Sequence, residues 1–343
     1  MDIVVLCGGL SAERDVSIAS GTKVAGALRR RGHRAVLIDL FFGYPKNYEV
    51  PSDIFEKVQS DNVAAIGESA PDLKLLTQDR SDSRSRIGEN VTELCLAADI
   101  VFLALHGTDG EDGKVQAAFD LAGIRYTGTG SLGSSLAMNK DISKKLFSQS
   151  GIPTPESKTV YKRDIKYENV GFPCVVKPTS GGSSIGTSIV TAAEQYPAAL
   201  ELAFRYDDSA IVERYVEGRE CSVGVIAGRT LPPIEICPKT GFYDYKNKYS
   251  GLTEEICPAN LPDEIAAKIK AAAASVFQTL CLEVYGRIDF IVDEDGAIWC
   301  LEGNTLPGLT EASLLPQEAA AAGIPYEDLC ELIIHESLKK YTD

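Results

Sequence analysis

The residues most capable of chemistry lie in one stretch, GRIDFIVDEDGAIWCLEGN at 286–304. Two apolar alternations flank Asp295-Gly296, a dipeptide that is a strong signal for a tight β-hairpin. If the turn consists of these two residues, four polar side chains share one face, because side chains along a strand alternate with a period of two. These four residues are Arg287, Asp289, Glu302 and Asn304. The other face is apolar and is predicted to pack in a core that contains Ile288, Phe290, Val292, Trp299 and Leu301.

In this register Asp289 lies opposite Glu302, and Arg287 lies opposite Asn304. Opposed Cβ atoms are about 4.5–5.5 Å apart, and like charges at that separation repel, which indicates a cation between the two carboxylates. Two carboxylates and an amide form an oxygen set that suits Mg²⁺. A solvated hairpin face with scattered charges is the alternative. A three-residue turn would put Asp289 and Glu302 on opposite faces and remove the metal site.

A second stretch, VVKPTSGGSSIG at 175–186, combines a lysine with a Gly/Ser loop. An apolar strand ends at Lys177, and another strand is predicted after the loop. The backbone N–H groups of such a loop can fold over phosphates while the lysine supplies a point charge. The GxxxxGK[ST] pattern of a P-loop is absent. A plain hairpin linker is the alternative.

Other candidate residues stand at the ends of predicted strands or helices. Glu213 and Glu220 flank a turn between two strands and could bind an adenine amino group and ribose hydroxyls, although exposed glutamates are common. His106 follows the strand at 100–105, at the carboxyl end where open α/β sheets bind ligands. Glu13 stands at a helix N-terminus that points toward a possible ligand. Taken alone, this position favours a structural role for Glu13 as a partner of the helix dipole over a role in ligand binding.

The segment at 241–257 has no clean periodicity and mixes aromatic residues with lysines and acids. Long irregular segments of this kind are often active-site lids. Residues 41–97 are the least informative part of the chain, and they include a Ser-, Asp- and Arg-rich stretch that reads as an exposed insertion.

The elements around these residues predict an α/β protein. A strand at 2–7, a helix and a strand at 35–39 form a βαβ unit, and hence a parallel sheet. The GxGxxG dinucleotide fingerprint is missing, which argues against a dehydrogenase. A Gly/Ser linker is predicted at 128–136, so that the first domain ends near residue 130.

Composition narrows the class of protein. The 343 residues are 44% apolar and 24% charged, as in ordinary globular proteins. The net charge of −15 argues against nucleic acid or an anionic membrane as partner. Nine cysteines occur without a CxxC pair, so neither a zinc site nor a disulfide scaffold is indicated, and a reducing cytoplasm is expected. No apolar run is long enough to span a membrane, and the start MDIVVLCGG reads as a strand.

The order of these motifs resembles the ATP-grasp ligases, and within them the D-alanine–D-alanine ligase family. The matching stretches are CGGLSAERDVS, ALHGTDGEDG, VVKPTSGGSSIG, VERYVEGRE, YDYKNKY and GRIDFIVDEDGAIWCLEGNTLPGLT. They cover the chain apart from about 41–97. The resemblance implies an N-terminal domain at 1–130, then two small α+β domains at 131–213 and 214–343 that clasp ATP.

The resemblance also implies a reaction for peptidoglycan synthesis. ATP would phosphorylate the carboxylate of one D-alanine, and the amine of a second would displace phosphate. Two Mg²⁺ (or Mn²⁺) would bind Asp289, Glu302 and Asn304. ATP would contact Lys140, Lys177, Glu213, Arg214, Val216, Glu220 and Lys248. The substrates would contact Glu13, Val16, His106, Arg287, Gly308, Ser313 and Leu314, and catalytic roles would fall to Glu13, Ser183, Tyr249 and Arg287.

Within this picture Ser183 would hydrogen-bond both Glu13 and the lid residue Tyr249, which in the family accompanies D-alanine as second substrate. Two residues depart from the family pattern: Glu311 replaces a small polar residue or histidine, and Gly303 replaces alanine or valine. D-alanine–D-serine ligation, or another ATP-grasp carboxylate–amine ligation, is therefore kept as the alternative. The family further implies a cytoplasmic homodimer.

Overall fold

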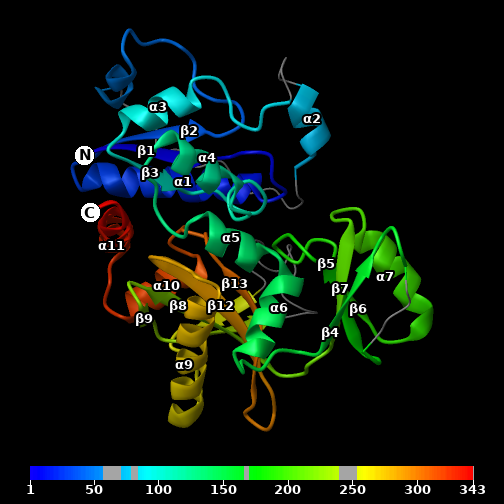
Figure 1. Cartoon of the computed structure of the whole chain (residues 1–343). Coiled ribbons are helices and arrows are strands. Elements are labelled where there is room, and N and C mark those ends of the chain that lie inside the picture. The colour runs from blue at the N-terminus through cyan, green and yellow to red at the C-terminus, as the bar shows by residue number, and fades with distance from the viewer. Residues whose placement is uncertain (57–70, 79–83, 166–169, 239–252, 343) are drawn as a thin grey trace.

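The computed structural model describes residues 1–343 except 57–70, 79–83, 166–169, 239–252 and 343. Its first sheet is parallel, in the order β2-β1-β3, and α1 connects β1 to β2 (Figure 1). The predicted βαβ unit is thus confirmed. The elements of this part are β1 (Asp2–Cys7), α1 (Arg14–Arg30), β2 (Arg34–Asp39), η1 (Pro51–Glu56), α2 (Leu73–Gln78), α3 (Val91–Ala97), β3 (Ile100–Leu103) and α4 (Lys114–Ala122).

The second sheet is antiparallel, in the order β4-β7-β5-β6, with α7 on one face (Figure 1). Cys174 and Val176 of β5 are fully buried in the core with α7, whereas the alternate residues Val175 and Lys177 line a cleft. The sheet therefore has one core face and one cleft face. Its elements are β4 (Ser157–Tyr161), β5 (Cys174–Pro178), β6 (Ser188–Val190), η2 (Ala193–Gln195), α7 (Tyr196–Ala203) and β7 (Ser209–Arg214).

The third sheet is also antiparallel, in the order β11-β10-β8-β12-β13, with β9 paired to β8. Helix α9 covers one face, where Ile269 and Val276 pack in the same core as Ile288 and Phe290 of β12. Its elements are β8 (Arg219–Ile226), β9 (Arg229–Thr230), β10 (Ile234–Pro238), β11 (Thr253–Ile256), α9 (Asp263–Thr279), β12 (Tyr285–Val292) and β13 (Ile298–Asn304). The chain ends with α10 (Leu314–Ala321), α11 (Tyr326–Leu338) and η3 (Lys339–Tyr341).

Helices α5 (Ser131–Met138) and α6 (Lys140–Gln149) lie between the second and third sheets in Figure 1. The Gly/Ser linker predicted at 128–136 is wrong for most of its length, because Gly130 precedes a regular helix. Phe147 of α6 packs in the core of the third sheet, and α11 packs against α1 of the first. These contacts join residues on opposite sides of the domain boundaries predicted at 130 and 213. The division into three domains stays a prediction.

Candidate active site

The hairpin of β12 and β13 brings the predicted polar residues to one face, but its turn differs from the predicted one. Asp289 pairs with Glu302 and Arg287 with Asn304, as predicted. The turn, however, has three residues, because Val292 pairs with Ile298 and the Asp293 N–H donates to the Ala297 carbonyl. Such a turn alone would separate the carboxylates.

A β-bulge restores the register. Between Asp289 and Phe290 the pairing shifts by one residue, and Leu301 is the extra residue of β13. The predicted core face is therefore wrong for two residues, since Leu301 lines the cleft and Trp299 stacks under Arg214, whose guanidinium carbon is 4.7 Å from the ring centre. Cys300 occupies the core in their place.

Asp289 is 8% exposed and accepts hydrogen bonds from three neighbouring side chains. Arg287 donates from Nε and Nη2 to its two oxygens, each at 2.9 Å. The Ser222 hydroxyl donates to Oδ1 at 2.7 Å, and the Asn304 amide donates to Oδ2 at 2.9 Å. Glu302 is half-buried, with the Lys140 ammonium 3.1 Å away. One cation thus stands beside each carboxylate.

These side chains suit Mg²⁺ only together with oxygen atoms from a ligand. Among the described residues no group of three or more His, Cys, Asp or Glu side chains could hold a metal ion. The two carboxylates and the Asn304 amide still share one face. Mg²⁺ is commonly bound by one or two carboxylates plus substrate phosphates, and that is what this donor set offers.

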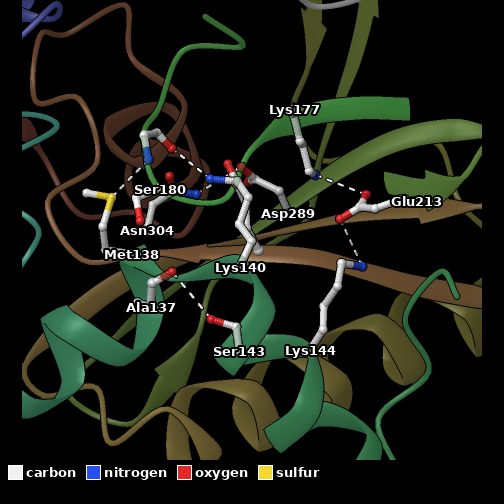
Figure 2. Close-up of polar contacts among 12 residues, drawn as sticks. Ala137, Met138, Lys140, Ser143, Lys144, Lys177, Ser180, Glu213, Asp289 and Asn304 are labelled. Atoms are coloured by element: carbon white, nitrogen blue, oxygen red, sulfur yellow. Dashed lines mark hydrogen bonds and ion pairs between the residues drawn. The ribbon is translucent and has the colours of Figure 1, made fainter. Parts of the chain in front are cut away.

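Glu213 on β7 lies between two lysines (Figure 2). Lys177 Nζ is 3.0 Å from Oε2, and Lys144 Nζ is 3.2 Å from Oε1. Burial works to raise the pKa of Glu213, but the two ammonium groups outweigh it and hold that pKa below its usual value. Burial also works to lower the pKa of Lys177, but the nearby carboxylates, Glu213 first and then Glu302 and Glu220, outweigh it, so that this pKa is raised. Glu213 is thus an ionised hydrogen-bond acceptor.

A cleft between the second and third sheets is lined by most of the predicted nucleotide-binding residues. Adjoining it is a much smaller cavity, which also reaches Glu111 and Asn304. Both cavities are bordered by Lys140, Gly181, Gly182 and Glu302. The predicted residues that line the larger cleft are Lys140, Lys177, Glu213, Arg214, Val216, Glu220, Asp289 and Glu302.

The Gly/Ser loop joins these cavities to the N-terminal domain. The buried Ser183 hydroxyl donates a short hydrogen bond to Glu13, which is the contact predicted between them. A side chain at Gly182 would place its Cβ 2.5 Å from a Glu13 oxygen, so that glycine permits this close approach. At Gly181, the carbonyl accepts a hydrogen bond from Lys140 at 2.7 Å and the N–H donates to the Met138 sulfur.

His106 is buried and bonds two other segments. Its Nδ1 lies 2.7 Å from the Leu306 carbonyl, and its Nε2 lies 3.0 Å from the Ser20 hydroxyl. Burial lowers the pKa of His106. The neutral ring therefore donates from Nδ1 to the carbonyl and accepts the Ser20 proton at Nε2. His106 thus links α1 to the loop after β13.

The remaining predicted substrate residues lie around that loop and the start of α10. Val16 is buried on α1, and Leu314 is buried with Ile234 and Ile236 of β10. The Ser313 hydroxyl accepts from the Thr310 N–H at 3.1 Å. A side chain at Gly308 would place its Cβ 2.8 Å from the Ser313 Oγ atom. Lys248 and Tyr249 lie outside the described residues.

Four polar residues near the site were missed by sequence reasoning: Ser222, Lys144, Glu111 and Glu318. Glu111 accepts from the backbone N–H groups of Gly107 and Leu306, and burial raises its pKa to about 7. Glu318 of α10 is fully buried and accepts from Gly224, the strand neighbour of Arg287; burial raises its pKa well above the usual value.

Comparison with known proteins agrees with this architecture. The sequence profile described as "D-ala D-ala ligase N-terminus" matches residues 2–129, and that described as "D-ala D-ala ligase C-terminus" matches 146–335. The chain belongs to the D-alanine–D-alanine ligase family. Family membership and the α/β ATP-grasp fold class were thus predicted correctly.

Relatives in the D-alanine–D-alanine ligase family match this chain over its whole length. The D-alanine–D-alanine ligase of Lacticaseibacillus casei is 45% identical over 100% of this chain and 97% of its own. That of Pediococcus pentosaceus is 43% identical over 100% of this chain and 99% of its own. The crystal structure of the Bacillus anthracis ligase complexed with ATP matches with a TM-score of 0.75 at 32% identity, over 99% of this chain and 98% of that one.

The two departures from the family pattern have different surroundings. Gly303 points toward the core, where an added Cβ would lie 3.0 Å from the Leu280 side chain. The glycine thus fits a close approach of α9 to β13. Glu311 is exposed at the start of the α10 region. Within the described part of the chain, none of the helices combines the length and apolarity that crossing a bilayer requires.

Proposed function

We propose that this chain joins two D-alanine molecules to D-alanyl-D-alanine, converting ATP to ADP and phosphate, as a step in peptidoglycan precursor synthesis. The main support is that the two cavities meet at Lys140, Gly181, Gly182 and Glu302. The larger cleft is lined by the predicted nucleotide-binding residues, and the smaller cavity reaches Asn304 and, in the N-terminal domain, Glu111. A phosphoryl group held at this junction can be passed to an acceptor in the smaller cavity.

The first step would transfer the γ-phosphoryl group of ATP to a carboxylate oxygen of the first D-alanine, leaving ADP. Phosphoryl transfer depends on positioning and charge stabilisation more than on covalent chemistry by the protein. Lys140, Lys177 and Lys248 would supply positive charge along the phosphates. Two Mg²⁺ (or Mn²⁺) held by Asp289, Glu302 and Asn304 would neutralise charge on the β- and γ-phosphates. At the other end of the cleft, Glu213 would accept from the adenine amino group and Glu220 from the ribose, beside the backbone of Arg214 and Val216.

In the second step the amine of the second D-alanine would attack the acylphosphate carbon. The tetrahedral intermediate would then release phosphate and a proton. Arg287 is fixed by two hydrogen bonds to Asp289 and would stabilise the negative oxygen of this intermediate. A donor held in place before the reaction needs no reorganisation as charge develops.

Substrate binding would use both ends of the site. Glu13 would pair with the ammonium group of the first D-alanine while Ser183 holds its carboxylate in place. Tyr249 would bond Ser183 as the lid closes, which would exclude water from the acylphosphate. The second D-alanine would place its carboxylate near Ser313. Val16, His106, Gly308 and Leu314 would complete the pocket walls.

A homodimer in the cytoplasm is part of the same proposal. Full-length relatives at 43–45% identity that carry the name D-alanine–D-alanine ligase support the reaction over its alternative. D-serine as second substrate is the alternative, motivated by Glu311 beside the α10 region.

The test is D-alanine-dependent release of phosphate from ATP, with the dipeptide identified by mass spectrometry. D-serine or D-lactate is then added as a competing second substrate. We expect D-alanyl-D-alanine as the main product and one phosphate per dipeptide. Phosphate release that is independent of D-alanine, or a mixed product that dominates in the competition, would contradict the proposal.

A further inference from the structure

Lys144 is a buried lysine with no role in the proposed reaction. It lies on α6, one turn after Lys140, and its side chain is 4% exposed. Its ammonium group lies 3.2 Å from Glu213 Oε1, 2.6 Å from the Thr154 hydroxyl oxygen and 3.4 Å from the Pro155 carbonyl. The Thr154 and Pro155 oxygens accept hydrogen bonds from this ammonium group, and its contact with Glu213 is an ion pair.

The two lysines approach Glu213 from different sides. Figure 2 shows the ammonium groups of Lys177 and Lys144 on opposite sides of the Glu213 carboxylate. Lys177 and Glu213 line the cleft, whereas Lys144 does not. A nucleotide in the cleft can therefore draw Lys177 toward its phosphates, but it does not reach Lys144. The cation that stays beside Glu213 in both the free and the occupied cleft is Lys144.

A lasting positive charge behind Glu213 fixes what this residue can recognise. An ionised carboxylate only accepts hydrogen bonds, and an opposite charge nearby favours the ionised form. The 6-amino group of adenine donates, so it fits such an acceptor. A 6-oxopurine such as hypoxanthine or guanine presents a carbonyl oxygen at that place, and two acceptors would then face each other.

We propose that Lys144 is a positioning residue that keeps Glu213 an acceptor for a purine 6-amino group and so sets the preference for adenine over 6-oxopurine nucleotides. The inference rests on the proposed function in one respect, the contact of Glu213 with the nucleobase. Loss of a hydrogen bond to a charged group costs about 1.5–3 kcal/mol, which corresponds to roughly a 10- to 150-fold change in affinity.

A purely structural role makes a different prediction. The Thr154 hydroxyl donates to the Cys300 carbonyl at 2.8 Å while accepting from Lys144. Lys144 could therefore serve only to fasten α6 and the segment after it to β13. The substitution Thr154→Val breaks this tether and leaves the Lys144–Glu213 pair in place, so it is the matched control for Lys144→Met, which removes the charge at similar volume.

The experiment is calorimetric titration of the full chain with ADP and with IDP, each with Mg²⁺, at pH 6 to 8. We expect Lys144→Met to weaken ADP binding about 10-fold or more and to reduce the ADP-over-IDP preference by a similar factor. Its ADP affinity should also fall as the pH falls, because Glu213 takes up a proton. Thr154→Val should keep the preference within about twofold of the parent chain.

A double-mutant cycle separates the effect of Lys144 on Glu213 from a general loss of stability. If Lys144 acts through Glu213, then Lys144→Met should change the preference little in a chain that already carries Glu213→Gln. Additive effects, an unchanged preference in Lys144→Met, or an equal loss in Thr154→Val would each overturn the proposal. A chain that prefers ADP but forms no dipeptide would refute the proposed function and leave this inference standing.

Discussion

Replacing Arg287 with alanine tests whether this residue acts in catalysis and not in ATP binding. The Arg287 side chain is 14% exposed and bonds both oxygens of Asp289, but it does not line the nucleotide cleft. We therefore expect a large fall in kcat and a KM for ATP within about threefold of the parent value. Removal of one donor that stabilises a developing oxyanion costs about 10²–10³ in kcat, or about 2.7–4 kcal/mol.

The same substitution also affects stability. Asp289 keeps its hydrogen bonds from Ser222 and Asn304 but loses two from Arg287. Loss of hydrogen bonds to a charged group costs about 1.5–3 kcal/mol. The control is Arg219→Ala, because Arg219 makes a similar two-bond pair with Glu235 on the same sheet without lining the cleft. The control should lower the melting temperature and leave kcat nearly unchanged.

The assay is steady-state formation of ADP and dipeptide at varied ATP concentration, alongside thermal unfolding of both variants. If Arg287→Ala keeps kcat within threefold of the parent chain while folded, the assigned role is wrong. A fall in kcat that Arg219→Ala reproduces would assign the effect to stability of the sheet.

Three further predictions concern the neighbours of this face. Ser183→Ala removes the hydrogen bond to Glu13, so the KM for D-alanine should rise about tenfold and more ATP should be consumed per dipeptide; an unchanged ADP-to-dipeptide ratio would count against the role of this contact. Glu302→Gln should raise the Mg²⁺ concentration needed for half-maximal activity about tenfold or more, whereas an unaltered Mg²⁺ titration would remove Glu302 from the metal site. The pKa of Glu111 is raised from 4.5 to about 7 by burial, so the protonated form favours folding: this stabilisation is complete below about pH 4.5 and is lost as the pH rises through 7. Glu111→Gln should therefore flatten the fall in melting temperature across that window, and parallel curves for the two chains would exclude Glu111 as the cause.

The family and the parallel sheet of the N-terminal domain could be predicted because they depend on patterns that are local in the sequence. The βαβ opening, the Lys177 loop and the Asp295-Gly296 turn each lie within one short segment. Contacts between segments could be predicted only through the resemblance, as for Ser183 and Glu13, which are 170 positions apart. The linker error at 128–136 has a related cause, since glycine and serine begin a helix whose apolar face packs against another sheet.

The site residues that were not predicted differ in how clearly the sequence pattern points to them. Lys144 lies four positions after Lys140, so a helix brings both to one face. Ser222 lies two positions after Glu220 on the same strand and therefore shares its face. Glu318 stands in an alanine-rich helix without any such pattern. In the core it accepts a hydrogen bond from the Gly224 N–H, a contact that sequence periodicity does not show.

The hairpin shows how a correct pairing can follow from an incorrect turn. A three-residue turn moves the pairing by one position, and the bulge at Leu301 moves it back. On the turn side of the bulge Cys300 packs in the core, and beyond it Glu302 faces Asp289. In the sequence, this change of face coincides with the unbroken apolar run at 297–301, AIWCL, where strict alternation stops. A bulge is an insertion that changes the face of all later residues, so an interrupted alternation between a turn and a set of candidate ligands should be tested in both registers before either face is assigned.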